Sequence, residues 1–249
     1  MTPPTPSPGR LRQMQIYVPG VGGAKPRVPV APDALEAKAA AIMSRDAAAY
    51  VVGGAGMEAT MRANRAAFDR HRFVPRVLND VATRDLSVEL FGRRHAAPVL
   101  LAPIGVLEMA HAQADLAVAR ACAMEGIGYV FSNQASVPME KTASAMGEAP
   151  RWFQLYWSSD DAFVRSVVGR AEACGCEAIV VTLDTTLLGW RPRDLDRASL
   201  PFLKGQGLAQ YLSDPVFRAA IPAAPPETGL KPKGLGVIDA LLSLRRKGR

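Results

Sequence analysis

Short apolar runs alternate with amphipathic stretches through the middle of the chain. The apolar runs are rich in branched and aromatic residues and stand at 99–102, 128–131, 152–156 and 178–184. Runs of this length and composition are typical of strands that are buried on both faces. The stretches between them have helical patterns, each followed by a glycine, and cover 113–125, 138–146 and 160–174. The pattern therefore predicts four strands joined by three crossover helices.

The spacing of the runs indicates the kind of sheet. Counted from Val99, Tyr129, Trp152 and Ala178, the strands recur every 23 to 30 residues. This repeat predicts an α/β fold with a parallel sheet, and both a doubly wound sheet and a barrel fit it. No strand is followed by a G-x-G-x-x-G turn, which counts against a dinucleotide-binding sheet. In either architecture we expect functional residues at the carboxyl ends of the strands.

The region before the first apolar run has a different composition. Residues 1–30 are rich in proline and glycine, which predicts a flexible lead-in that resists packing into a core. Residues 31–96 start with alanine, leucine, glutamate and lysine, which favour helices. We expect an N-terminal helical segment there, with one helix over 33–49 and a second over 56–69.

Overall composition narrows the class of protein. The chain has 49% hydrophobic and 21% charged residues, as an ordinary globular protein does. No apolar run approaches the roughly 18 residues that a membrane-spanning helix needs. The first residues also lack the apolar centre of a secretory signal. We therefore expect a cytoplasmic protein with no membrane contact.

Charge and cysteines add little to this picture. The net charge of +7 is compatible with a polyanionic partner, but most of the positive residues are scattered along the chain. The basic run Arg245–Arg249 fits a solvated tail or a weak nucleic-acid contact; because no aromatic residues interleave it, we favour the tail and expect no nucleic-acid partner. Cys122, Cys174 and Cys176 lack the spacing of metal ligands, so we expect reduced thiols and no metal site.

Polar and small residues follow each predicted strand. The strand ends carry Ala102 to Gly105, Ser132 to Gln134, Gln154 with Tyr156, and Thr182 with Asp184. An AYVVGGAG element that includes Tyr50 lies upstream, and an LLGWRPRD element that includes Arg191 lies downstream. In this order and spacing, the elements resemble the FMN-dependent α-hydroxy-acid oxidase and dehydrogenase family over about residues 30–232. The GWRP segment at 189–192, together with SDPVF at 213–217, is most similar to the lactate 2-monooxygenase branch.

The resemblance implies a fold and a division of the chain. The family fold is a TIM (β/α)8 barrel preceded by N-terminal helices, and about its first four βα units match here. On this reading residues 97–188 are a partial FMN-binding barrel and residues 189–232 are a long loop after the fourth strand. Residues 233–249 do not align with the family and are a divergent basic tail.

The resemblance also implies an FMN site. Pro103, Ile104 and Gly105 match the backbone segment that lies against the flavin ring, where a small residue lets a planar cofactor approach the chain. Ser132, Gln154 and Thr182 match residues that hydrogen-bond the polar edge of the flavin.

Four residues match positions that handle the substrate and the proton. Tyr50 and Tyr156 match the tyrosines that meet the substrate carboxylate and hydroxyl, and Arg191 matches a substrate-binding arginine. Asp184 matches the carboxylate that orients a catalytic histidine, so Tyr156 and Asp184 carry the implied catalytic roles. The implied substrate is a small L-2-hydroxy acid such as lactate, with O2 as the electron acceptor. Family members commonly form oligomers, which leaves a homo-oligomer open.

Each of these residues also has a plainer interpretation. Tyr50 fits a packed helix residue, and Asp184 fits a helix cap. Gln154 and Thr182 fit residues that satisfy loop backbone groups, and Arg191 fits a surface ion pair. His111 matches a family position that is not the catalytic base, so we interpret it as structural.

The length of the matching region predicts an incomplete barrel. About 150 residues follow Ala97, whereas an eight-unit barrel takes about 250. The family keeps its catalytic histidine, a flavin-stabilising lysine and the phosphate-binding loops in the other half. We therefore expect the isolated chain to hold the FMN phosphate poorly and to be inactive. The alternative is a non-catalytic half-barrel remnant or interaction protein with weak or no flavin binding.

Overall fold

Helices make up most of the amino-terminal part of the computed structural model, which describes residues 7–185 and 187–221. They are α1 (Pro8–Gly20), α2 (Pro32–Ile42), α3 (Arg45–Val52) and α4 (Ala59–Ala67), followed by the 3-10 helix η1 (Phe68–Arg70). The helix predicted over 33–49 is divided into α2 and α3. The division falls at Ser44, whose side chain accepts a hydrogen bond from the Ala47 amide and so begins a new helix.

Helix α1 corrects one expectation. Its prolines and glycines predicted a flexible segment, whereas residues 8–20 are helical. Pro8 lies in the first turn, where its missing N–H leaves no hydrogen bond unmade, and the Ser7 side chain accepts a hydrogen bond from the Arg10 amide. No residue of α1 is buried, so this helix adds nothing to the core.

A small hairpin between the helices and the sheet is absent from the prediction. Strands β1 (Val88–Leu90) and β2 (Arg93–His95) pair antiparallel, so the segment 31–96 is not purely helical. Phe91 and Gly92 form the turn, and both have positive φ, which suits the twist of a two-residue hairpin. Each strand is only three residues long and carries charged side chains, so the sequence gives no clear alternating signal.

The hairpin covers the amino ends of the larger sheet. Arg93 forms an ion pair with Glu177 and donates a hydrogen bond to the Glu148 carbonyl. Phe91 packs edge-on against Trp152, with 5.3 Å between the ring centroids. These contacts lie at the end of the sheet opposite the predicted site.

The larger sheet has the four predicted strands in sequence order. They are β3 (Leu100–Leu101), β4 (Gly128–Phe131), β5 (Arg151–Tyr156) and β6 (Ile179–Thr182). All neighbours are parallel, in the order β3-β4-β5-β6. A doubly wound sheet reverses its strand order at a switch point, whereas these strands advance in one direction, as in a barrel.

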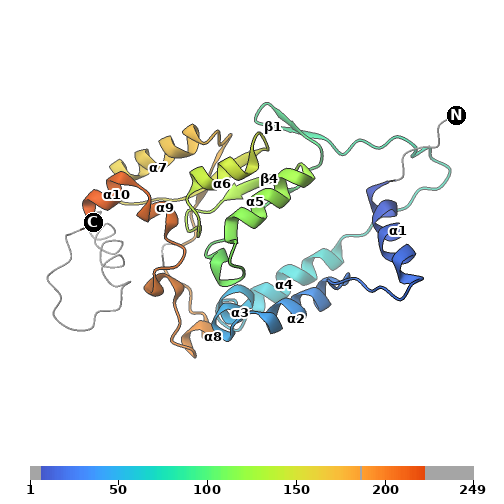
Figure 1. Ribbon diagram of the computed structural model, residues 1–249, viewed down its shortest axis with the longest axis horizontal. Coiled ribbons are helices and arrows are strands. Elements are labelled where there is room, and N and C mark those ends of the chain that lie inside the picture. Colours follow the sequence, from blue (N-terminus) through green and yellow to red (C-terminus); the bar gives the residue numbers. More distant parts are fainter. Residues whose placement is uncertain (1–6, 186, 222–249) are drawn as a thin grey trace.

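The predicted crossover helices are also present. They are α5 (Ala114–Glu125), α6 (Met139–Met146) and α7 (Asp161–Ala173), with the 3-10 helix η2 (Leu107–Met109) ahead of α5. They lie together on one side of the sheet (Figure 1). The predicted apolar stripe of α7 faces the core, since Phe163, Val164, Val167 and Ala171 are buried. Four strand side chains meet the helices in the same core: Tyr129, Phe131, Phe153 and Leu155.

The segment after β6, predicted as a long loop over 189–232, contains short helices in its described part. They are α8 (Pro192–Leu195), the 3-10 helix η3 (Pro201–Lys204), α9 (Ala209–Leu212) and α10 (Pro215–Ala220). Tyr211 and Phe217 enter the core and contact Phe163. The proline in the first turn of α8, η3 and α10 is the sequence signal for these helices. The tail predicted at 233–249 lies outside the described residues.

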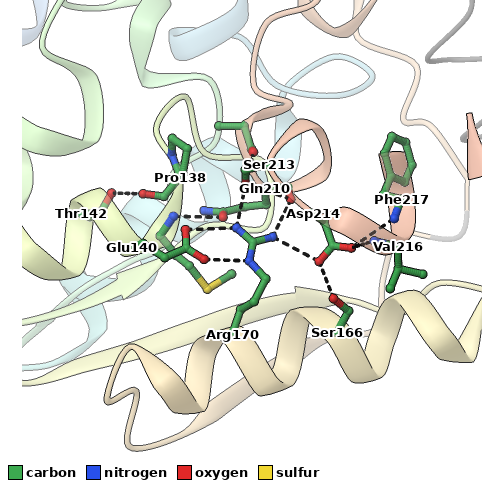
Figure 2. A network of polar contacts seen from close by, with 12 residues as sticks. Pro138, Glu140, Thr142, Ser166, Arg170, Gln210, Ser213, Asp214, Val216 and Phe217 are labelled. Atoms are coloured by element: carbon green, nitrogen blue, oxygen red, sulfur yellow. Dashed lines mark hydrogen bonds and ion pairs between the residues drawn. The ribbon is translucent and has the colours of Figure 1, made fainter. Parts of the chain in front are cut away.

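A polar network attaches this segment to the barrel helices (Figure 2). Arg170 on α7 forms ion pairs with Glu140 on α6 at 2.7 Å and with Asp214, the N-cap of α10, at 3.2 Å. Asp214 is fully buried and also accepts hydrogen bonds from the Ser166 hydroxyl and the Val216 amide. The network therefore fixes α9 and α10 against α6 and α7.

The edge strand β6 is less covered than its neighbour β5. Ile179 and Val181 point to the same side of the sheet as Phe153 and Leu155, yet they are 36% and 40% exposed. Leu183, just beyond the strand, is 81% exposed. None of the helices in the described ranges has the length and apolar content needed to cross a membrane.

Candidate active site

The amide of Gln154 connects three strands at their carboxyl ends. Its Oε1 accepts a hydrogen bond from the Asn133 amide at 3.1 Å, and its Nε2 donates to Thr182 Oγ1 at 2.8 Å. Asn133 follows β4, Gln154 lies in β5 and Thr182 ends β6. Gln154 is almost fully buried, so the two contacts fix the orientation of its amide.

Three further hydrogen-bond donors along this edge have no acceptor among the described residues. Ser132 Oγ accepts from the Gln134 amide at 3.1 Å, which leaves its O–H to donate. Thr182 Oγ1 accepts from Gln154 and likewise keeps its O–H, and Gln154 Nε2 keeps a second N–H. Ser132, Gln154 and Thr182, the residues predicted to meet a flavin edge, are thus brought together by adjacent strands.

The segment after β3 lies against the turn after β4. A Cβ added to Gly105 would lie 3.3 Å from Gln134 Cβ and 3.7 Å from Ser132 Oγ, so a larger residue would push the two segments apart. The Val106 amide donates to the Gln134 carbonyl at 2.9 Å. Of the preceding residues, Pro103 is half-buried and Ile104 is 43% exposed. The predicted flavin-facing segment therefore lies beside Ser132.

Tyr50 and Arg191 meet although they are 141 residues apart in the sequence. The Arg191 guanidinium lies 5.1 Å from the centroid of the Tyr50 ring, and its Nη2 donates to the Tyr50 carbonyl. Arg191 Nε also donates to Asp194 Oδ2 at 2.5 Å. Tyr50 packs edge-on against Phe202. These contacts join α3 to the segment after β6 and favour a built site over an isolated surface ion pair.

Electrostatics link Tyr50, Tyr156 and Asp184. Burial raises the pKa of Tyr156, and the nearby charge of Asp184 raises it further. Burial also raises the pKa of Tyr50, which the Arg191 cation partly offsets. Both phenols are therefore neutral near pH 7 and able to donate hydrogen bonds. The helix-cap interpretation of Asp184 finds no support, because the next described helix, α8, has Arg191 as its N-cap.

Two residues of this region, Asn133 and Asp194, have no role in the prediction. Asn133 is fully buried and contacts Gln154, Tyr156 and Tyr211 through its amide groups. Asp194 is buried behind Arg191, and its Oδ1 has no hydrogen-bond partner among the described residues. The spacing of three between Arg191 and Asp194 is the signal that identifies this pair.

The histidines lie apart from these contacts. His111 Nδ1 accepts a hydrogen bond from the Gln113 amide at 3.1 Å, as a structural residue in a turn would. His95 is buried in β2, at the other end of the sheet. Within residues 7–185 and 187–221, no histidine forms a hydrogen bond or ion pair with Tyr156 or Asp184.

Ion pairs hold the amino-terminal helices on the segment after β6. Glu58 pairs with Arg193 at 2.6 Å and accepts a hydrogen bond from the Gly54 amide. Asp46 pairs with Arg197 at 2.5 Å and with Lys204 at 3.0 Å. Because Tyr50 lies between Asp46 and Glu58 in the sequence, these pairs also hold the Tyr50–Arg191 contact in place.

We expect the contribution of Asp46 to depend on pH. Lys204 and Arg197 lower its pKa from 3.8 to about 2. A carboxyl whose folded pKa is lowered stabilises the fold above its unfolded pKa and loses this contribution as pH falls through the folded value. The difference in Tm between the wild type and Asp46→Asn should therefore be constant above about pH 5 and shrink between about pH 4 and 2. Thermal unfolding across this range at low salt measures it.

A matched control is Asp196→Asn, which replaces another exposed carboxyl close to the same segment. Its Tm should follow that of the wild type throughout the same pH range. A difference for Asp46→Asn that persists unchanged at pH 2 would contradict the role given to its ion pairs. Added salt should reduce the difference at neutral pH, since exposed charges are screened.

Comparison with known proteins finds a matching family and similar proteins. The FMN-dependent dehydrogenase family matches residues 39–234. An L-lactate oxidase of Lysinibacillus sphaericus is 42% identical over 173 residues, which are 70% of this chain and 45% of that protein. An FMN-dependent alpha-hydroxy acid dehydrogenase of Penicillium citrinum is 39% identical over 208 residues, covering 83% of this chain and 52% of that protein. The chain thus spans about half the length of these curated relatives.

Solved structures of mandelate oxidase are also similar to this chain. A mandelate oxidase with (S)-2-phenylpropionate matches with a TM-score of 0.69 and 35% identity, over 76% of this chain and 55% of that chain. A variant of mandelate oxidase with a C4a-OH-FMN adduct matches with a TM-score of 0.61 and 36% identity, over 66% and 50% of the two chains. The four-stranded parallel sheet described above belongs to a TIM barrel of this kind.

Proposed function

Because the chain belongs to the FMN-dependent dehydrogenase family, we propose that it supplies the amino-terminal part of a site that oxidises a small L-2-hydroxy acid. The observation that carries this proposal is the Gln154–Thr182 pair at the carboxyl ends of β5 and β6, with Tyr156 at the end of the same strand β5. The likeness to an L-lactate oxidase supports a lactate-like substrate and O2 as the electron acceptor, in an oxidase or a lactate 2-monooxygenase.

The donor set of this edge fits FMN. Ser132, Gln154 and Thr182 are neutral residues with unused donors in a row, which suits the carbonyl and ring-nitrogen acceptors of a flavin edge. The segment Pro103 to Gly105 lies beside them and would contact the flavin plane. When bound, FMN supplies an acceptor for the two electrons that leave the substrate α-carbon.

The substrate groups have matching partners. Arg191 is a cation whose Nη1 is not engaged by the contacts to Tyr50 and Asp194, so it suits a carboxylate. The neutral phenol of Tyr50 adds a second donor for the same carboxylate. In this proposal Tyr156 hydrogen-bonds the substrate hydroxyl. Asp184, beside Tyr156, would orient and stabilise a cationic base that takes the hydroxyl proton.

We propose that the isolated chain turns over substrate negligibly. Its three histidines are His71, His95 and His111, and in the described ranges none contacts Tyr156 or Asp184. Because Asp184 in this proposal orients the base and is not itself the base, the group that accepts the hydroxyl proton comes from outside these contacts. We include a homo-oligomer in this proposal only as one way to bring such a group to the site.

The visible spectrum of the chain titrated with FMN tests the proposal. We expect binding that Gln154→Leu weakens by about 10-fold, since one to two hydrogen bonds are worth roughly 0.5–1.5 kcal/mol each. The matched control is Gln113→Leu, an exposed glutamine that contacts Arg120, and it should bind FMN as the wild type does. L-lactate and mandelate are then added anaerobically to the wild type, and no bleaching of the flavin is expected.

The possible outcomes separate the proposals. Bleaching by L-lactate would refute the inactivity of the isolated chain, and bleaching by mandelate alone would refute the lactate-like substrate. An unperturbed FMN spectrum in the wild type would refute the flavin site. That last result would favour the alternative, a non-catalytic half-barrel that acts as an interaction protein.

A further inference from the structure

Asn133 makes three hydrogen bonds at the centre of the candidate site. Its backbone N–H donates to Gln154 Oε1 at 3.1 Å. Its side-chain Oδ1 accepts from the Tyr156 amide at 3.3 Å, and its Nδ2 donates to the Tyr211 hydroxyl at 2.6 Å. The residue is 0% exposed, so the side chain has no water to replace a lost partner.

The orientation of the Asn133 side chain follows from its partners. The Tyr156 backbone N–H can only donate, so it requires the Oδ1 of Asn133 on its side. The Nδ2 then faces Tyr211, whose hydroxyl must accept. If the amide turned over, two N–H donors would face each other. The Tyr156 amide therefore selects the orientation, and the Tyr211 hydroxyl, which can donate or accept, takes the accepting role.

Tyr211 is held firmly by the core. Its ring stacks on Phe163 with 5.3 Å between centroids and an angle of 18° between the planes. It also packs edge-on against Phe217 at 5.3 Å. Both neighbours are almost fully buried, and burial keeps the phenol of Tyr211 neutral by raising its pKa. The hydroxyl that meets Asn133 thus comes from a fixed ring on α9.

We infer that Asn133 and Tyr211 form a positioning pair that holds the Gln154 amide and the end of β5 in the geometry the site requires. The pair touches neither substrate nor cofactor in this role; it acts through Gln154 and Tyr156. It also connects the short helices after β6 to the strand ends, since Tyr211 belongs to α9. The inference rests on the proposed function, because Gln154 and Tyr156 are site residues only under that proposal.

Tyr211→Phe tests the pair, because it removes the hydroxyl and keeps the stacked ring. Tyr129→Phe is the matched control: Tyr129 is 1% exposed and its hydroxyl donates to Asp115 Oδ1 at 3.3 Å, on the helix side of the sheet. Each variant loses one buried hydroxyl, so both should lose stability to a similar degree. A purely structural role would give the two variants the same effects.

Three readouts on the full chain separate the variants. They are the FMN affinity, the NMR signals of the Gln154 side-chain amide, and the hydrogen exchange of the Tyr156 amide. In Tyr211→Phe the Asn133 side-chain amide loses its partner. FMN binding should then weaken by about 10-fold, and hydrogen exchange of the Tyr156 amide should become about 10-fold faster. The NMR signals of the Gln154 side-chain amide should shift. In Tyr129→Phe all three should stay close to the wild type, within about 2-fold for the affinity and the exchange rate.

Equal behaviour of the two variants in Gln154 signals and Tyr156 exchange would overturn the positioning pair. If the wild type binds no FMN, the proposed function fails on that result alone. The NMR and exchange readouts need no cofactor, so they still decide whether Asn133 and Tyr211 position Gln154 and Tyr156. A changed FMN affinity in Tyr211→Phe with unchanged NMR and exchange would also contradict the pair.

Discussion

Replacing Asp214 by alanine should destabilise the protein by about 3–5 kcal/mol, the cost of removing one partner from a buried ion pair. Asp214 is 0% exposed and receives hydrogen bonds from Arg170, Ser166 and the first turn of α10. Without it, the Arg170 guanidinium, only 14% exposed, keeps Glu140 but loses its second carboxylate. Helix α10 loses its N-cap at the same time. Urea unfolding followed by circular dichroism measures the change.

The control for this variant is Asp85→Ala. Asp85 also pairs with an arginine, Arg94, at 3.1 Å, but the two side chains are 67% and 73% exposed. Exposed pairs of this kind are worth roughly 0–1 kcal/mol, so little should change. A loss below about 1 kcal/mol for Asp214→Ala would mean that the network shown in Figure 2 is not a structural anchor.

Phe163→Ala should cost about 3–5 kcal/mol, the range for deleting a buried aromatic side chain. Phe163 is 1% exposed and contacts Tyr211 and Phe217 at the same time. Its removal leaves a cavity between α7 and the short helices α9 and α10. The free energy of unfolding in urea, with the m-value as a check on two-state behaviour, measures this loss.

Phe73→Ala is the matched control, because Phe73 is fully exposed in the segment before β1. It should change the free energy of unfolding by no more than about 0.5 kcal/mol. Equal losses for the two phenylalanines would contradict the core assigned to α7. Tyr156 exchange should also quicken in Phe163→Ala, since Tyr211 loses the ring that fixes it.

The barrel portion follows from local sequence signals. β4 begins and ends where its apolar run does, and the three helices end within one residue of the predicted positions. Each of the three helices is followed by a glycine with positive φ, such as Gly126, and β4 is a continuous apolar run. Where local propensity and burial favour the same element in this way, the sequence pattern alone predicts its position.

Other elements depend on contacts between residues far apart in the sequence, so local patterns do not predict them. The β1–β2 hairpin is held by Arg93 on Glu177, 84 residues away, and its own strands carry no apolar alternation. The short helices after β6 are stabilised because Tyr211 and Phe217 pack against Phe163 in the core. Neither contact is visible in a window of ten or twenty residues.

In the candidate site too, some contacts could be predicted from local patterns and others could not. Gln154 and Thr182 stand at strand ends, and a parallel sheet brings strand ends together, so their meeting could be predicted. The meeting of Tyr50 with Arg191 followed only from the resemblance to a family. Asn133 was visible at a strand end, but its role depends on Tyr211, which lies 78 residues further along the chain.

The long separation between Tyr50 and Arg191 determines when the candidate site can assemble during synthesis. Neighbouring strands pair across short distances, as Tyr129 does with Arg151, so the sheet can form while the chain is still emerging from the ribosome. The contacts of Tyr50 and Asp46 span 141 to 158 residues and must wait for Arg191 and Lys204 to be made. Each doubling of a loop adds about 0.6 kcal/mol to the entropy cost of closing it. We therefore expect the nascent chain to form the sheet before the candidate site.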